Sequence, residues 1–121
     1  FMLWEKQMKK EGIVFINVCH TRKDQAGTQK PKDENGEETF KRVDEYDVHG
    51  TSSIPQSADY NIVLNRNKNA SDPIEKNTTY VDLPKARGGT TSHNVLELYY
   101  DSVTRQQVDR EVWLQEQKVN F

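Results

Sequence analysis

The sequence predicts an α/β fold with a mixed sheet, parallel at one side and antiparallel at the other. Residues 13–19 are near-continuously apolar and β-branched, which is typical of a strand buried on both faces of a parallel sheet. A helical pattern and a glycine precede this run, so the two together form half of an α/β unit. Three later strand patterns, at 60–65, 78–83 and 95–100, follow one another in hairpin order.

The first expected element is the end of a helix over residues 3–10. Leu3, Trp4 and Met8 fall at helical spacing, and two lysines at positions 9 and 10 suit the negative end of the helix dipole. Gly12 is a suitable stop signal, because glycine readily adopts the left-handed conformation that ends helices. The buried strand at 13–19 comes next.

Residues 20–49 have the opposite character. From His20 to Val48 the chain carries six basic and eight acidic side chains and few large apolar ones. A long unpatterned segment of this kind indicates a functional or solvated loop. Residues 50–59 then predict a short helix, opened by hydroxyl side chains and with Pro55 near its start.

The second half of the chain predicts strands separated by turns. A polar turn at 67–72 follows the strand at 60–65, and the Gly88-Gly89 turn separates the strands at 78–83 and 95–100. Residues 105–113 fit either a fifth strand or a terminal helix, and the pattern assigns nothing to 114–121.

Composition narrows the class of protein. The chain has 121 residues, of which 33% are hydrophobic, well below the roughly 45–50% of ordinary globular domains. The net charge is -2, so there is no polybasic signature, and no apolar run approaches the ~18 residues of a membrane helix. A single cysteine, Cys19, excludes an internal disulfide and fits a reducing compartment. We expect an intracellular, thinly cored polypeptide that is part of something larger.

Three features invite a functional interpretation, and each has a plainer alternative. His20 directly follows the apolar strand, where ligands bind in open α/β sheets, and the alternative is a loop histidine without a partner. Lys85 and Arg87 lie two residues apart before a glycine turn, so both side chains share one face and suit a polyphosphate. The alternative there is a solvated hairpin end. The cations of the 20–49 loop could contact a nucleic-acid backbone or simply face solvent.

Several common catalytic motifs are absent from the 121 residues. There is no G-x-x-x-x-G-K-[ST] phosphate loop, no G-x-S-x-G elbow and no Cys/His spacing suited to a metal. We therefore expect no complete catalytic site in the chain.

Four landmarks, taken in order, resemble the C-terminal part of the RecA-like P-loop ATPase motor domain of DnaB-type replicative helicases. The likeness is closest to the phage primase–helicase branch and its mitochondrial relative. The landmarks are residues 13–19 ending in His20-Thr21-Arg22-Lys23, the glycine–small–small…Gln-x-x-Asp stretch at 50–59, the strand at 62–66, and Lys85-Ala86-Arg87-Gly88-Gly89-Thr90. Residues 96–101 then fit the final hairpin.

The resemblance implies roles for individual residues. His20 would sense the γ-phosphate, Gln56 would relay that signal, and Arg66 would lie near the nucleotide base. Arg87 would be an arginine finger that reaches the neighbouring subunit's ATP, with Lys85 beside it. The implied contacts to single-stranded DNA are Arg22, Lys23, Lys30, Lys32, Thr51 and Ser52.

The resemblance also implies cofactors and partners. Residues 1–105 would belong to the motor domain, with 20–49 as the DNA-binding loop and 106–121 as an extension. ATP and Mg²⁺ would be held mainly by an upstream part of the domain, since the chain lacks the phosphate loop and catalytic Glu. The partners would be single-stranded DNA and the other subunits of a homo-hexamer, in the cytoplasm of a phage's bacterial host. Pro84 departs from the family pattern and weakens strand pairing before Lys85.

Two alternatives from other classes stay open. One is a related recombination or repair ATPase of the same fold, which would form filaments and exchange strands. The other is a non-catalytic interaction module, in which the Lys85–Arg87 pair and the 20–49 loop hold a partner.

Overall fold

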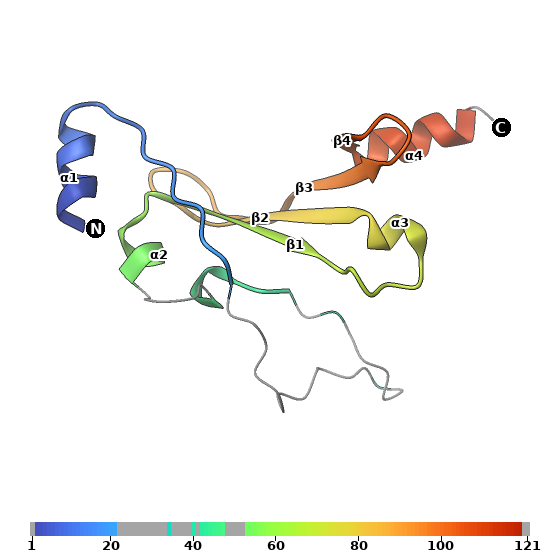
Figure 1. Ribbon diagram of the computed structural model, residues 1–121, viewed down its shortest axis with the longest axis horizontal. Coiled ribbons are helices and arrows are strands. Elements are labelled where there is room, and N and C mark those ends of the chain that lie inside the picture. The colour runs from blue at the N-terminus through green and yellow to red at the C-terminus, as the bar shows by residue number, and fades with distance from the viewer. Residues whose placement is uncertain (1, 22–33, 35–39, 41, 48–52, 120–121) are drawn as a thin grey trace.

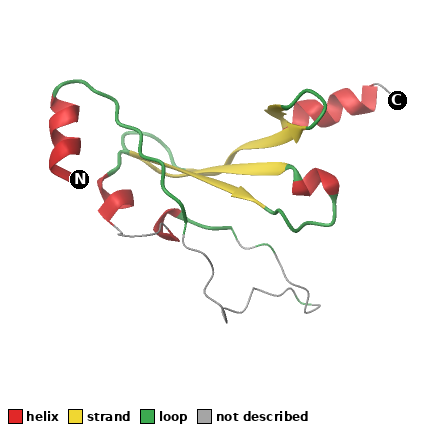
Figure 2. Cartoon of the chain, viewed as in Figure 1, coloured by secondary structure: helices red, strands yellow, loops and turns green. Residues whose placement is uncertain are grey.

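A computed structural model describes residues 2–21, 34, 40, 42–47 and 53–119 of the chain (Figure 1). The helices are α1 (Met2–Lys10), the 3₁₀ helix η1 (Glu45–Asp47), α2 (Ser53–Ser57), α3 (Pro73–Lys76) and α4 (Arg110–Val119). The strands are β1 (Tyr60–Arg66), β2 (Thr78–Ala86), β3 (Ser92–Asp101) and β4 (Gln106–Asp109). Helices α1 and α2 lie at one end of the sheet, and α3 and α4 lie at the other (Figures 1 and 2).

The sheet is an antiparallel meander, so the prediction of a mixed, RecA-like sheet is wrong. Its strand order is β1-β2-β3-β4, and every neighbouring pair is antiparallel. Parallel pairing needs a crossover of about a dozen residues or more, whereas residues 87–91 and 102–105 connect their strands through tight turns. Within the described residues there is accordingly no parallel strand.

The apolar run at 13–19 is not a strand. It is irregular, and its side chains project into solvent, with Val14 84% and Val18 86% exposed. The composition does favour β structure, but a strand needs a neighbour to accept and donate its backbone hydrogen bonds. The four strands of the sheet pair with one another, which leaves this segment outside the ladder.

Helix α1 ends as the sequence predicts. Gly12 has a φ of +72°, the N–H of Ile13 donates to Met8 O at 3.0 Å, and the N–H of Gly12 donates to Lys9 O at 3.1 Å. This pair of hydrogen bonds is the Schellman arrangement, in which a left-handed glycine turns the chain away from the helix axis.

The predicted strands at 60–65, 78–83 and 95–100 are confirmed, each with slightly longer bounds. The predicted helix at 50–59 is confirmed over Ser53–Ser57. Two short elements were missed or left open. Helix α3 interrupts the β1–β2 connection, and the stretch after residue 105 divides into β4 and α4. The carboxylates of Asp72 and Asp109 cap the N-termini of α3 and α4, because they accept from Ile74 N and Val112 N respectively.

Pro84 lies inside the central strand β2, at a bulge. Lys85 pairs with Asn61 and Asp82 pairs with Val63, so two residues of β2 lie opposite Ile62 alone. A bulge is where a sheet tolerates proline, since the missing N–H has no ladder partner to satisfy there.

The exposed face of the sheet is apolar and the covered face is polar, which is the reverse of the usual arrangement. Leu64, Val81 and Leu96 are cross-strand partners on one face, and Leu64 is 63% exposed. Asn65 and Tyr80 are cross-strand partners on the other face, where Asn65 is only 4% exposed. Tyr80 is a buried hydrophobic side chain on this face, 8% exposed, and Pro55 in α2 is buried as well.

The covered face is therefore held by polar contacts. Arg42 lies over the Tyr80 ring, 4.0 Å from its centroid, and pairs with Asp82 at 3.8 Å. The Tyr80 hydroxyl donates to the Glu75 carboxylate at 2.6 Å. Burial, with help from this hydrogen bond, raises the pKa of Tyr80 to about 12.

At the far end of the sheet, an ion pair and an aromatic stack attach α4 to β3. Arg110 Nη1 contacts Glu97 Oε2 at 2.7 Å, and the rings of Tyr99 and Trp113 stack with centroids 4.0 Å apart. None of the helices in the described part of the chain has the length and apolar character to cross a membrane.

Asn65 ties the 42–47 segment to the sheet. Its Nδ2 donates to Val43 O at 3.1 Å, and its Oδ1 accepts from Val43 N at 2.8 Å. Asn65→Ala leaves both backbone groups without partners, so it should lower the free energy of unfolding by about 1–3 kcal/mol. Urea unfolding followed by circular dichroism measures this. Asn69→Ala, in an exposed turn, should change stability by no more than about 0.5 kcal/mol; equal losses in the two variants would contradict the role given to Asn65.

Candidate functional site

A cluster of charged side chains occupies the end of the sheet where β1 begins and β2 ends. Tyr60 pairs with Ala86 at this end, so Asp59 and Arg87 are brought side by side just beyond the strands. The N–H of Arg87 donates to Asp59 O at 2.8 Å and extends the ladder by one bond. Helices α1 and α2 lie at the same end (Figure 1).

Lys85 holds helix α2 against this end of the sheet. Its Nζ donates to Gln56 O at 2.7 Å and to Pro55 O at 3.1 Å. The last carbonyls of a helix lack partners inside it and carry partial negative charge, so an ammonium group there is favourable. Two of the three donors of Lys85 are thus used within the fold.

Asp59 lies between two cations from different parts of the chain. Its Oδ1 contacts Arg87 Nη1 at 2.7 Å, and its Oδ2 contacts Lys9 Nζ at 3.0 Å. Lys9 also contacts Glu5 Oε1, one turn earlier in α1, at 3.4 Å. We call Asp59 with Lys9, Lys85 and Arg87 the Asp59 cluster.

The electrostatics of the Asp59 cluster favour the charged forms of Asp59 and Lys9. The hydrogen bond from Lys9 is the main influence that lowers the pKa of Asp59, and the charges of Lys9, Arg87 and Lys85 add to it. The hydrogen bond to Asp59 in turn raises the pKa of Lys9. Three cations and the two carboxylates of Asp59 and Glu5 leave an excess of one positive charge, which is a suitable setting for an anion.

The structure brings together three of the residues singled out from the sequence. Gln56, Lys85 and Arg87 lie at the same end of the sheet, with Gln56 contributing its backbone oxygen and leaving its side chain exposed. The Arg87 side chain is 63% exposed.

Arg66 and His20 are placed elsewhere. Arg66 ends β1 at the opposite end of the sheet, where Nε donates to Lys76 O at 2.8 Å and Nη2 donates to Asn77 Oδ1 at 3.0 Å. His20 is exposed, at the end of the irregular 13–20 segment, and takes no part in the contacts of the Asp59 cluster. The expected DNA contacts Arg22, Lys23, Lys30, Lys32, Thr51 and Ser52 lie outside the described residues.

Sequence reasoning gave no role to Lys9 or Asp59 in a site. The i, i+4 spacing of Glu5 and Lys9 could have suggested their ion pair. The contact between Lys9 and Asp59 joins residues fifty positions apart, and nothing in either local pattern predicts it.

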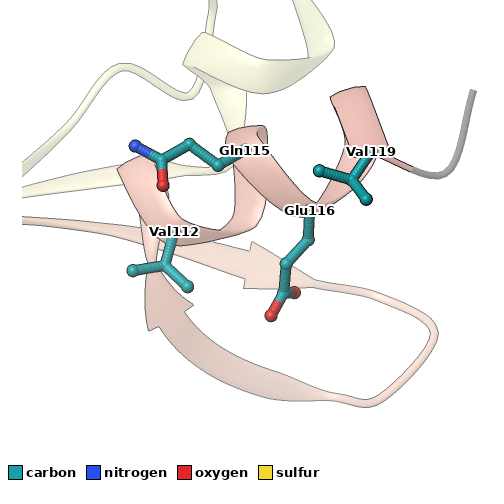
Figure 3. A pocket seen from close by; sticks show the side chains of 4 residues that line it. All are labelled: Val112, Gln115, Glu116 and Val119. Carbon is teal, nitrogen blue, oxygen red and sulfur yellow. The ribbon is translucent and has the colours of Figure 1, made fainter.

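In the part of the chain that the structure describes, the other surface features offer no comparable site. A hollow at the far end of the molecule is lined by Val112, Gln115, Glu116 and Val119, which all belong to α4 and are all exposed (Figure 3). Over the described ranges, no three His, Cys, Asp or Glu side chains gather in a way that could hold a metal ion. No known protein-family model matches the chain, and no curated protein is significantly similar to it.

Because of the ion pairs of Asp59, part of the free energy of unfolding should depend on pH in the acid range. The pKa of Asp59 is lowered in the folded chain, so its contribution is present above about pH 4 and is lost as the pH falls through the folded value. Asp59→Asn removes the titrating group. The difference in unfolding free energy between wild type and Asp59→Asn should therefore shrink as the pH falls from 5 to about 2.

Urea unfolding at a series of pH values measures this difference. Asn69→Ala removes no titrating group, so its difference from wild type should stay constant over the same range. A constant difference for Asp59→Asn as well would contradict the contacts of Asp59.

Proposed function

We propose that the chain is part of an ATP-driven replicative DNA helicase, in which Arg87 contacts the nucleotide of a neighbouring subunit. The observation that supports this most is the meeting of Gln56, Lys85 and Arg87 at one end of the sheet. The resemblance to DnaB-type helicases assigns these residues to the ATP site, and they come from separate elements, α2 and the end of β2.

The contacts of Lys85 and Arg87 indicate different roles for the two side chains. Lys85 is engaged with the α2 carbonyls and keeps Gln56 near the strand end. Arg87 is largely exposed and makes its side-chain contact with a solvent-accessible carboxylate. An exposed guanidinium can reach a phosphate supplied by another polypeptide and bind it through two parallel N–H groups. Arg87 is therefore the residue of the pair that would act in trans.

The remaining parts of the proposal follow from the resemblance. The 20–49 loop would grip single-stranded DNA through Arg22, Lys23, Lys30 and Lys32, largely by electrostatic attraction to phosphates. His20 would sense the γ-phosphate. ATP and Mg²⁺ would be bound mainly by a segment that carries a phosphate loop, in a hexamer that works in the cytoplasm. We give Arg66 no nucleotide contact, because Nε and Nη2 already bind the α3 turn.

A second candidate function is a non-catalytic interaction module. The exposed apolar segment at 13–18 and the exposed apolar face of the sheet favour it, since such surfaces are frequently covered by a partner. In that case the gene product would have no ATPase activity, whatever residue stands at position 87.

Arg87→Ala in the complete gene product should lower DNA-stimulated ATPase turnover by a factor of about 10³ or more, because a trans arginine neutralises charge on the transferring phosphoryl group. Nucleotide binding, measured by equilibrium dialysis, should stay within a few-fold of wild type. Arg105→Ala removes an exposed arginine from the β3–β4 turn and should leave turnover within about twofold.

Near-normal turnover in Arg87→Ala would overturn the role of Arg87. A complete gene product without any DNA-stimulated ATPase activity would overturn the helicase proposal as a whole and leave the interaction module.

A further inference from the structure

The two carboxylate oxygens of Asp59 contact different cations. Oδ1 contacts the guanidinium of Arg87, and Oδ2 contacts the ammonium of Lys9. The three side chains come from the β1 entry, the β2 exit and helix α1, so the carboxylate is a junction between elements. It is also accessible, since the Asp59 side chain is 34% exposed.

An anion that approaches this junction meets the same cations that Asp59 holds. Phosphate and carboxylate compete for a guanidinium because each can accept two parallel N–H bonds with a pair of oxygens, and a polyphosphate carries more charge than one carboxylate. A phosphate that binds the Arg87 guanidinium therefore has to displace the Asp59 carboxylate from it.

We propose that Asp59 is the resting partner of Arg87 and competes with phosphate groups for its guanidinium. This inference rests on the proposed function for the class of ligand, a polyphosphate such as that of a nucleotide. Asp59 acts through Arg87 and is a positioning residue.

Two contacts lower the free-energy cost of replacing Asp59 by a phosphate at the Arg87 guanidinium. The backbone bond from Arg87 N to Asp59 O at 2.8 Å keeps the base of the arginine in place, so only the guanidinium has to move. Lys9, 3.0 Å from Oδ2, remains with Asp59 after Arg87 has left, so the carboxylate keeps a partner of opposite charge. Lys9 itself stays anchored by Glu5, which is buried.

The direct test is titration of the 121-residue chain with inorganic triphosphate, followed by calorimetry. Asp59→Asn removes the competing charge, and an exposed ion pair of this kind corresponds to a gain in affinity of about two- to fivefold. Asp59→Glu keeps the carboxylate and should not reproduce that gain. Arg87→Gln should weaken binding, and the double variant should show no gain over Arg87→Gln alone.

Glu116→Gln is the matched control, because it changes the net charge equally on α4, at the far end of the molecule. Its affinity should equal that of wild type. Unchanged or weaker binding in Asp59→Asn, a gain of the same size in Glu116→Gln, or no measurable binding in any variant would each overturn the inference.

A second measurement needs no substitution. The carboxyl carbon of Asp59 can be followed by NMR through an acid titration, with and without triphosphate. The Lys9 hydrogen bond, the main cause of the lowered pKa of Asp59, stays in place, so loss of the Arg87 contact should raise that pKa by part of the lowering when triphosphate is bound. A pKa that does not rise would overturn the exchange.

These outcomes are separate from those of the proposed function, because triphosphate binding by the chain requires no ATP hydrolysis. A gain in Asp59→Asn together with an inactive gene product would reject the helicase and keep the exchange. Active ATPase with no gain would reject the exchange alone.

Discussion

The carboxylate of Asp59 is the contact on which the organisation of one end of the molecule depends. Through Lys9 the carboxylate fixes the last turn of α1, while the backbone oxygen of the same residue accepts from Arg87 N and fixes the chain as it leaves β2. Lys85, two residues earlier in the same strand, holds α2. Charge, more than apolar packing, attaches this end of the molecule, so the groups that hold the fold together there are also the groups able to bind an anion.

The same reliance on polar contacts extends along the covered face of the sheet. Asn65 and Asp82 are buried with partners from the 42–47 segment, and Tyr80 places its ring beneath Arg42. Buried polar groups of this kind are stable only while every partner is in place. The opposite face carries Leu64 and Leu96 towards solvent. The polar face of the sheet is covered and the apolar face is exposed. An exposed apolar face is suited to packing against another protein, which agrees with both candidate functions.

What could be predicted from the sequence was local. The alternation of residues in β1 and β2 and the lysine–glycine end of α1 are decided by near neighbours, and these elements were found. The run at 13–19 was misread because its residues have strand propensity whether or not a partner strand exists. The position of Lys85 and Arg87 at one strand end followed from the glycine turn after them. The junction at Asp59 did not, since it depends on where the Schellman turn of α1 and the meander place residues that are distant in the chain.

A structure of the complete gene product with a non-hydrolysable ATP analogue would show whether Arg87 exchanges the Asp59 carboxylate for a phosphate. The measured quantity is the distance from the Arg87 guanidinium to the γ-phosphate and to the Asp59 carboxylate. We expect Arg87 to lie within hydrogen-bond distance of a neighbouring subunit's γ-phosphate and to have left Asp59, which keeps its contact with Lys9. A bound nucleotide remote from Arg87, with the 2.7 Å contact to Asp59 intact, would contradict it.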